Sequence, residues 1–422
     1  MKTLRFIAIA AASLIVSFGV YAQSSQVKVA PGIDVLEQRG FDCLRGKRVG
    51  LLTNPTGITS DVRSTIDVLN NAPEVNLVAL FAPEHGVRGD LYAGKHAADT
   101  IDARTGVPVY SLYGSHRQPT KEMFSQIDVL VYDIQDIGVR SYTFISCLGL
   151  AMRTAAETGV KVVVLDRPNP LGGLKVEGNY VEKGYYSYVS QYPIPYVYGL
   201  TVGEVALMIN SEGMNRGQKG DLKPLVCDLE VVPMKGWTRD MLFGDTGLPW
   251  VQTSPNIPTA MSAVHCASSG IIGDVSGFLN IGIGYTLPFA VFGASWIDAA
   301  ELKARLDSYN LPGVAFKEVY FVPMAGKDQG VLQKGVQYYY TDYDAATITM
   351  TGFYVMQAVS ELYPDHNPYV NPDAKVRYDK VCGTGYLSSV LSKTMKISLV
   401  EGYWAKDVEN FKALSSKYYL YK

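Results

Sequence analysis

Polar and charged residues follow three apolar runs of the sequence at the point where each run ends. The run at 75–82 leads into Glu84, His85 and Arg88. The runs at 129–134 and 161–165 lead into the other candidates, which are Asp133, Gln135, Asp136, Arg140, Tyr142, Asp166, Arg167 and Asn169. If these runs are parallel strands, their carboxyl ends meet at one edge of a sheet, where open α/β folds bind ligands. We therefore predict a binding site at that edge.

Glu84 is the leading candidate for a general acid or base. Phe81, Pro83 and Val87 are its apolar neighbours in sequence, and an apolar environment favours the neutral form of a carboxyl. A carboxyl that keeps its proton near neutral pH can protonate a leaving group. The alternatives are a Glu that caps the following turn, or one that pairs with Arg88.

His85 could shuttle protons, hold a substrate, or donate a structural hydrogen bond to a carbonyl at a strand end. A metal site formed by His85 with Asp133 or Asp136 is a further alternative. The chain has no HExxH motif and no second His near His85. We therefore predict no metal ligands here.

The residues after the run at 129–134 differ in the direction they would face. With the period-two geometry of a strand, Asp133 and Gln135 share a face and Asp136 points elsewhere. One of the two Asp residues would orient hydroxyl groups of a ligand or activate water. The alternative for Asp136 is an N-cap for the helix that follows.

Two arginines in these loops suit a ligand with a carboxylate. The guanidinium groups of Arg140 and Arg167 can each bind a carboxylate through two parallel hydrogen bonds. The alternative for both is an internal salt bridge, to Asp133 or to Asp166. The spacing of the residues does not separate the two possibilities.

The runs that carry these residues alternate with helical patterns. Five apolar runs lie at 47–54, 75–82, 107–113, 129–134 and 161–165. Continuous apolar strands separated by helices are typical of a parallel sheet covered on both faces. We predict a Rossmann-like doubly wound α/β domain over 27–258 and a smaller α+β domain over 259–422. No GxGxxG follows the first run and no P-loop occurs, so we expect no cofactor.

Further elements follow from the same periodicity. The predicted helices are at 59–71, 121–126, 143–158, 201–212, 299–306, 352–362 and 398–417, and a predicted strand is at 331–340. The segment 250–259 contains two prolines and is predicted to be an extended linker or a loop of the site.

The first 22 residues have the pattern of a secretory signal peptide. Lys2 and Arg5 precede an apolar run at 6–20, and the small-residue cleavage pattern ends at Ala22. We expect an exported protein, periplasmic or secreted; the alternative is an uncleaved anchor. No later segment is apolar enough over a bilayer's width, so we predict no stable membrane insertion after cleavage.

Composition excludes some classes of protein. The net charge of −2 predicts no electrostatic attraction to nucleic acid. The five Cys residues are widely spaced without a CxxC motif, which excludes a disulfide scaffold and a zinc module. We expect most of them to be buried as small apolar residues.

Eight segments occur in the order typical of one known family. They are FAPEHGVRG at 81–89, YDIQDIGVRSYTF at 132–144, LDRPNPLGG at 165–173, VEGNYV at 176–181, PIPYVYGLTVGE at 193–204, SPNIPT at 254–259, GVQYYYTD at 335–342 and YYLY at 418–421. On these segments the chain resembles the exo-β-N-acetylmuramidases of the NamZ type, glycoside hydrolase family 171, long catalogued as a domain of unknown function. The resemblance covers about residues 30 to 422.

The resemblance implies a site between a Rossmann-like domain and a smaller C-terminal domain. It implies release of N-acetylmuramic acid from the non-reducing end of peptidoglycan fragments, with a sugar or muropeptide as the partner. Glu84 matches the Glu of the family's PEHG motif, the expected catalytic acid, and His85, Asp136 and Asp133 are further catalytic candidates. The lactyl carboxylate of muramic acid would suit Arg140 or Arg167. The residues assigned to substrate binding are Asn54, Arg88, Gln135, Arg140, Tyr142, Asp166, Arg167, Asn169, Glu177 and Asn256.

Two segments depart from the family pattern. Family members usually carry a stretch like YPGTxLFEGTNxSEGRGTTRPF after SPNxPT, whereas residues 265–289 read HCASSGIIGDVSGFLNIGIGYTLPF. Val275, Ile281 and Ile283 stand at the family's Glu and Arg positions, and Tyr198 stands where members tend to have His. These losses from a two-carboxylate glycosidase scheme predict a more apolar wall. They keep a second hypothesis open, a non-catalytic protein that binds muropeptides or glycans on the same scaffold.

Overall fold

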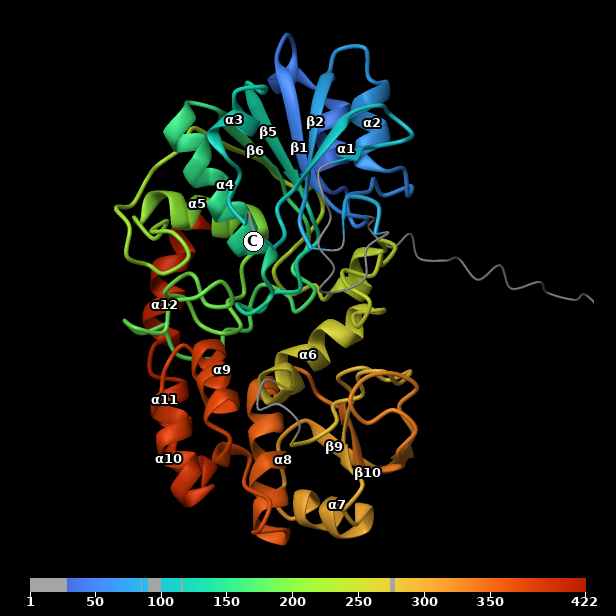
Figure 1. The fold of residues 1–422 in the computed structure, drawn as a ribbon, viewed down its shortest axis with the longest axis vertical. Coiled ribbons are helices and arrows are strands. Elements are labelled where there is room, and N and C mark those ends of the chain that lie inside the picture. The colour runs from blue at the N-terminus through green and yellow to red at the C-terminus, as the bar shows by residue number, and fades with distance from the viewer. Residues whose placement is uncertain (1–28, 85, 90–99, 115–116, 274–277) are drawn as a thin grey trace, which may run out of the picture.

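The chain folds into two lobes, with the N-terminal lobe above the C-terminal lobe in Figure 1. The computed structural model describes residues 29–84, 86–89, 100–114, 117–273 and 278–422. The predicted signal peptide 1–22 lies outside the described residues. Within the described ranges, no helix has both the length and the apolar character needed to cross a membrane.

A seven-stranded sheet forms the centre of the N-terminal lobe, in the order β3-β4-β2-β1-β5-β6-β7. Its strands are β1 (Arg48–Thr53), β2 (Asn76–Ala82), β3 (Thr100–Ile101), β4 (Pro108–Ser111), β5 (Val129–Asp133), β6 (Lys161–Leu165) and β7 (Leu229–Val232). All neighbouring strands are parallel except β3 and β4. The predicted doubly wound parallel sheet is therefore confirmed.

The two faces of this sheet pack into separate cores. Along β1, Val49 and Leu51 belong to the core on one face, and Leu52 belongs to the core on the other. Successive side chains of a strand alternate between faces, so burial of both faces requires a continuous apolar run. The helices around the sheet are α1 (Gly32–Gln38), α2 (Thr65–Asn71), α3 (Lys121–Phe124), α4 (Phe144–Thr158) and α5 (Val202–Ser211), with the short 3₁₀ turns η1 (Asp42–Leu44) and η2 (Phe243–Thr246).

The C-terminal lobe combines a small antiparallel sheet, in the order β8-β10-β9, with helices. Its strands are β8 (Val291–Ala294), β9 (Val314–Phe321) and β10 (Gln333–Tyr340). Its helices are α6 (Ala260–Gly273), α7 (Ala299–Asp307), α8 (Ile348–Leu362), α9 (Pro372–Cys382), α10 (Tyr386–Thr394), α11 (Glu401–Trp404) and α12 (Val408–Ser415), with η3 (Pro368–Val370), η4 (Ile397–Leu399) and η5 (Ser416–Tyr418). This mixture confirms the predicted α+β character.

The end of the chain returns to the N-terminal lobe, as Figure 1 shows. Phe411 of α12 is fully buried in the core that contains α4 and α5, and the Tyr421 hydroxyl donates to Asp166 at 2.6 Å. The helix predicted at 398–417 is divided at Asp407, whose carboxylate accepts from the N–H of Tyr180 at 2.8 Å. The domain limits of 27–258 and 259–422 stay a prediction, although the last segment contributes to the first lobe.

Candidate active site

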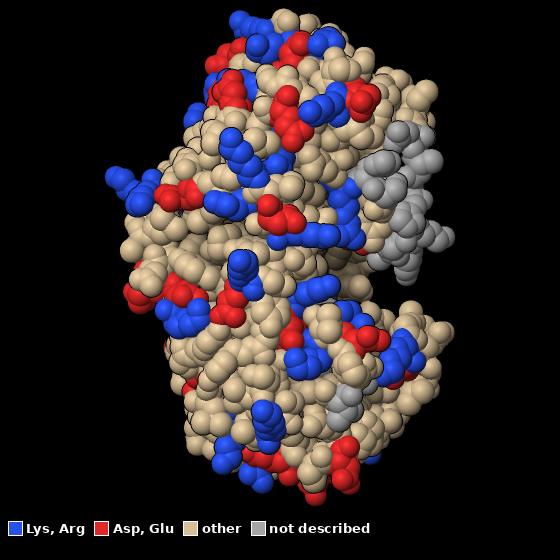
Figure 2. All heavy atoms as spheres, turned by 60° about the vertical axis from the view of Figure 1, so that its left-hand side comes forward, with Lys and Arg blue, Asp and Glu red and all other residues tan. Residues whose placement is uncertain are grey.

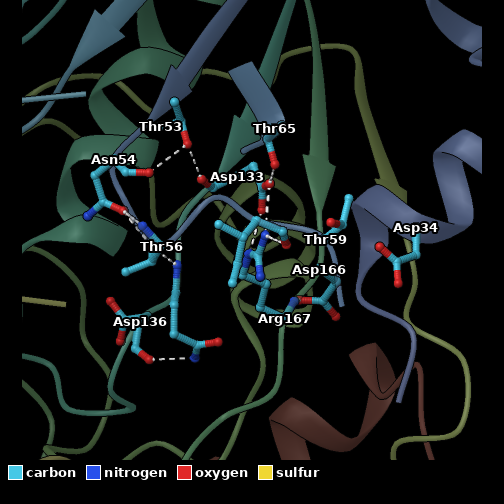
Figure 3. A network of polar contacts seen from close by, with 12 residues as sticks. Asp34, Thr53, Asn54, Thr56, Thr59, Thr65, Asp133, Asp136, Asp166 and Arg167 are labelled. Atoms are coloured by element: carbon cyan, nitrogen blue, oxygen red, sulfur yellow. Dashed lines mark hydrogen bonds and ion pairs between the residues drawn. The ribbon is translucent and has the colours of Figure 1, made fainter. Parts of the chain in front are cut away.

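The carboxyl ends of β1 and β5 meet where the sheet changes its direction of winding, because β1 leads to β2 on one side and β5 leads to β6 on the other. Such a point is the ligand-binding crevice of an open α/β sheet. Figure 3 shows the two loops bonded together. Asn54 Oδ1 accepts from the N–H and hydroxyl of Thr56 at 3.0 and 2.5 Å, and Thr56 Oγ1 accepts from the N–H of Gln135 at 2.9 Å. Asn54 and Gln135 thus order the crevice, and their contact with a ligand stays a prediction.

An ion pair between Asp133 and Arg167 fills the centre of this crevice (Figure 3). Arg167 Nε and Nη2 lie 2.5 and 2.9 Å from the Asp133 oxygens, and the Thr65 hydroxyl donates to Asp133 at 2.5 Å. The cavity beside Arg167 and Gln135 measures about 10 Å³, which is room for about one water. The structure therefore contains the internal salt bridge, and it does not support Asp133 as a catalytic residue or Arg167 as a substrate ligand.

Asp166 and Asn169 connect the segment that follows β6 to neighbouring segments through hydrogen bonds. Burial raises the pKa of Asp166 to about 6. The Asn169 side chain donates to the carbonyl of Leu200 and accepts from the N–H of Leu171. Asp166 is 0 % exposed and its oxygens accept from the N–H groups of Arg167 and Gly203 and the hydroxyls of Thr201 and Tyr421. Both side chains are engaged within the chain, and their contact with a substrate stays a prediction.

Arg140 and Glu177 join the two lobes rather than facing a ligand. Glu177 accepts from the N–H groups of Ile348 and Thr349 at 3.0 and 2.8 Å. These N–H groups belong to the first turn of α8, where backbone donors lack partners within the helix. Arg140 is 0 % exposed and donates to the carbonyls of Asn179, Ile194 and Val381. The structure does not support either residue as a sugar ligand.

Arg88 is also occupied within the N-terminal lobe. Its guanidinium binds Asp102 at 2.6 and 2.8 Å and lies 3.4 Å from Asp67. The ion pair holds the pKa of Asp102 well below its usual range. Arg88 is therefore not the partner of Glu84, and its predicted role in substrate binding is not supported.

Glu84 lies half-buried in the turn after β2. Its carboxyl forms a hydrogen bond with the hydroxyl of Tyr113, which follows β4, and burial followed by the Glu84 charge raises the pKa of Tyr113. Tyr188 lies close enough to Glu84 to feel its charge. The guanidinium carbon of Arg117 lies 4.4 Å from the centre of the Tyr188 ring. We call these four residues the Glu84 cluster.

Tyr113 and Arg117 were not predicted as site residues, and Tyr188 was considered for stacking on a sugar only as one of a group of tyrosines. Tyr113 ends the predicted run at 107–113, so the rule that placed candidates at the other strand ends points to it as well. Tyr188 is one of six tyrosines between residues 185 and 198, several of which are buried in the cores. No sequence signal separates Tyr188 from the others, because burial depends on the fold.

Asp136 has one carboxylate oxygen with donors and one without. Oδ1 accepts from the Tyr198 hydroxyl at 2.7 Å and from the N–H of Gly138 at 2.9 Å. Oδ2 is buried and has no hydrogen-bond partner in the part of the chain that the structure describes. Burial raises the pKa of Asp136 to about 6. Thr143 is the N-cap residue of α4, so Asp136 does not cap that helix.

The raised pKa of Asp136 predicts a dependence of stability on pH. Between about pH 4 and pH 6 the folded protein holds a proton that the unfolded chain has lost, so the free energy of unfolding falls as pH rises. Asp136→Asn should remove this contribution, up to about 1.4 kcal/mol per pH unit. Urea unfolding of both proteins from about pH 4 to pH 7 measures the two slopes. Asp166 remains in the variant and keeps its own contribution; equal slopes would contradict the prediction.

Three predicted site residues remain to be placed, and they are Tyr142, Asn256 and His85. The Tyr142 hydroxyl donates to Thr253 at 2.7 Å, in the predicted loop at 250–259. Asn256 is half-exposed in the same loop. His85 lies outside the described residues. For Tyr142, Asn256 and His85, contact with a ligand stays a prediction.

Two models of one protein family match the chain, one on each side of the start of α6. The model described as exo-beta-N-acetylmuramidase NamZ, N-terminal, matches residues 49–261, and the model of the C-terminal part matches residues 270–421. The chain belongs to the NamZ exo-β-N-acetylmuramidase family.

Relatives in the NamZ family are similar over almost the whole chain. The peptidoglycan beta-N-acetylmuramidase NamZ of Bacillus subtilis (strain 168) is 41% identical over 394 residues, 93% of this chain and 92% of the relative. A DUF1343 family protein of Bacteroides fragilis NCTC 9343 has a TM-score of 0.88 and 49% identity over 94% of this chain and 100% of its own. A second one has a TM-score of 0.74 and 28% identity over 94% of this chain and 99% of its own. The family predicted from the motifs is confirmed.

The structure shows where the residues that depart from the NamZ pattern lie in the fold. The segment 265–273 is the end of α6 rather than a loop. Ile281 is buried in the core of the C-terminal lobe and Ile283 packs against that core, so these two side chains do not form an apolar wall of the site. Val275 lies outside the described residues. Tyr198 donates a hydrogen bond to Asp136.

Proposed function

We propose that the chain is an exo-acting glycosidase that releases N-acetylmuramic acid from the non-reducing end of peptidoglycan fragments. The observation that carries this proposal is the Glu84 cluster. It presents a half-buried carboxyl, bonded to a tyrosine hydroxyl, at the sheet edge where open α/β folds bind ligands. The proposal agrees with the name of the Bacillus subtilis relative, a peptidoglycan beta-N-acetylmuramidase.

Glu84 would act as the general acid of this reaction. Its carboxyl donates a proton to the glycosidic oxygen while the bond between that oxygen and C1 of the muramic acid breaks. Water then adds at C1 and gives up a proton to the second carboxyl of the reaction. Tyr113 orients the carboxyl through its hydrogen bond. Asp136 is the second carboxyl we assign to the reaction, because Asp133 is paired with Arg167 whereas Asp136 Oδ2 has no donor among the described residues.

Charged and aromatic side chains near the site suit a sugar that carries an acid. Arg117 lies beside Tyr188 of the Glu84 cluster, and its positive charge attracts anionic substrates. Figure 2 shows a hollow between the two lobes, with side chains of Lys, Arg, Asp and Glu around it. Tyr142 and Tyr188 contribute flat rings that can pack on the apolar face of a sugar.

The place of action is part of the proposal. Lys2, Arg5 and the apolar run that follows them direct export, and the mature chain starts at Gln23, in the periplasm or outside the cell. Peptidoglycan fragments for cell-wall recycling are present there. The mass of the exported protein checks the cleavage point, and an uncleaved N-terminus would overturn it.

The second candidate function was a glycan-binding protein without catalysis, and it depended on the altered segment 265–289. Ile281 is buried in the core of the C-terminal lobe and Ile283 packs against that core. Two of the three replaced positions are thus engaged in packing, which leaves less support for the binding hypothesis, and hydrolysis is the function we favour.

Hydrolysis of a chromogenic N-acetylmuramic acid β-glycoside tests the proposal, alongside calorimetric binding of the free sugar. We expect turnover by the purified mature chain. Binding without turnover would support the non-catalytic alternative. Absence of both would overturn the assignment of muramic acid as the ligand.

A further inference from the structure

Arg117 is a half-buried cation with an aromatic neighbour and, among the described residues, no ion pair. Its guanidinium carbon lies 4.4 Å from the centre of the Tyr188 ring, a distance at which a cation is attracted to the ring face. In the part of the chain that the structure describes, no salt bridge of 4.0 Å or less involves Arg117. Its charge is therefore available to an anion from outside the protein.

Other arginines of the chain are used differently. The buried ones all bind carboxylates or backbone carbonyls, which is how proteins usually compensate the cost of burying a charge. These residues are Arg140, Arg153, Arg167 and Arg239. Arg140 and Arg167, which the family resemblance offered for the lactyl carboxylate, are thus already occupied. Arg117 is the half-buried arginine that remains beside the candidate acid.

Arg117 and Glu84 both lie near the same two tyrosines. Tyr113 hydrogen-bonds to Glu84 and also feels the positive charge of Arg117. Tyr188 likewise lies within the influence of both groups. Glu84 protonates the glycosidic oxygen of a sugar ring in the proposed reaction. A cation beside the same tyrosines can bind another substituent of that ring.

There is open space next to Arg117 for such a substituent. A cavity of about 590 Å³ is lined by Arg117 and Gln118 and by residues of the segment 217–222, among them Lys219 and Asp221. Its volume lies in the range of small-molecule sites. The charged residues of the lining are Arg117, Lys219 and Asp221. Their net charge is positive, which favours binding of an anionic group.

We propose that Arg117 binds the carboxylate of the lactyl group of the terminal N-acetylmuramic acid. This assignment rests on the proposed function. N-Acetylglucosamine lacks the lactyl ether and its carboxylate, so the contact distinguishes the two sugars. A guanidinium can bind a carboxylate through two parallel hydrogen bonds, which fixes the orientation of the ring as well as its identity. Arg117 is a specificity-determining residue in this scheme and takes no part in proton transfer.

The test compares chromogenic β-glycosides of N-acetylmuramic acid and N-acetylglucosamine. The kcat/KM for the N-acetylmuramic acid glycoside divided by that for the N-acetylglucosamine glycoside should fall about 10- to 100-fold in Arg117→Gln. The reason is that a charge-assisted hydrogen bond to the lactyl carboxylate is lost, and only the first substrate has that group. The loss should appear mainly in KM, and Arg117→Lys should restore part of the ratio. Arg104→Gln is the control, since Arg104 is a surface arginine that is 70% exposed and pairs with Asp67. Its ratio should equal that of the wild type.

Each outcome decides for or against the inference. A wild type that hydrolyses the muramic acid glycoside, with an unchanged ratio in Arg117→Gln, would overturn the role of Arg117 and leave the proposed function intact. If the wild type binds without turnover, the calorimetric Kd of N-acetylmuramic acid divided by that of N-acetylglucosamine replaces the kcat/KM ratio and must rise in the same variant. A wild type that neither cleaves nor binds N-acetylmuramic acid would overturn the proposed function and this inference together.

Discussion

Replacing Glu84 with Gln should lower kcat on an N-acetylmuramic acid β-glycoside by about 10²- to 10⁴-fold, the usual contribution of a general acid. The amide has nearly the shape of the carboxyl but no acidic proton to donate to the glycosidic oxygen. The Kd of the free sugar should change little, because the half-buried side chain keeps its position beside Tyr113. Steady-state kinetics and calorimetry on the same preparation give both numbers.

Glu182 provides a matched control for this substitution. It is also a partly buried Glu whose carboxyl accepts from a tyrosine hydroxyl, that of Tyr403, and it bonds to Thr384 as well. Those partners lie near α10 and α11, in the C-terminal lobe. Glu182→Gln should keep kcat within about twofold of the wild type, since its carboxyl takes no part in proton transfer. Full activity in Glu84→Gln would exclude Glu84 as the acid, and loss of binding together with unfolding would make it a structural residue.

Replacing Asp133 with Asn should lower the free energy of unfolding by about 3–5 kcal/mol, because it leaves the buried guanidinium of Arg167 without its counter-ion. Both side chains are buried at the crevice between β1 and β5. The Thr65 hydroxyl and the Ile58 carbonyl remain as neutral neighbours and cannot replace the lost charge. Urea unfolding, followed by far-UV circular dichroism, measures the change.

Two further variants separate charge burial from a general loss of packing. Asp307→Asn removes one partner of the surface pair with Lys303 and should change the unfolding free energy by less than about 1 kcal/mol. The double variant Asp133→Asn with Arg167→Met removes both buried charges and should recover part of the loss. A single Asp133→Asn variant as stable as the wild type would show that the pair contributes nothing net.

Five strands of the large sheet, β1, β2, β4, β5 and β6, could be predicted from the sequence because both faces of the sheet are buried. The run at 161–165 has the same limits as β6. The run at 129–134 is one residue longer than β5. Helix ends were harder to predict. The segment 59–71 contains α2 only from Thr65 onward, because the Thr59 hydroxyl accepts from the N–H of Arg63 and holds a turn there. The helix α6 was missed because its buried residues, which include the consecutive run 266–269, lie on more than one face and form no single apolar stripe.

The roles of the candidate residues depended on partners that are remote in sequence. Asp166 is bonded by Tyr421, which lies 255 residues away, and Arg140 by the carbonyl of Val381, 241 residues away. The type of a residue shows that it can bind a carboxylate or a carbonyl. It does not show whether a partner within the chain already occupies it.

The sequence by itself determined the family, the doubly wound sheet and the edge where its polar loops gather, because these follow from local apolar periodicity and from motif order. Only the tertiary structure decided which of those polar groups remain available for chemistry. Asp133 and Arg167 neutralise each other, whereas Asp136 keeps a buried oxygen without a donor among the described residues and Arg117 keeps its charge beside Glu84. The physical reason is that burying a charge requires a compensating partner, and long-range packing supplies that partner to some residues and not to others.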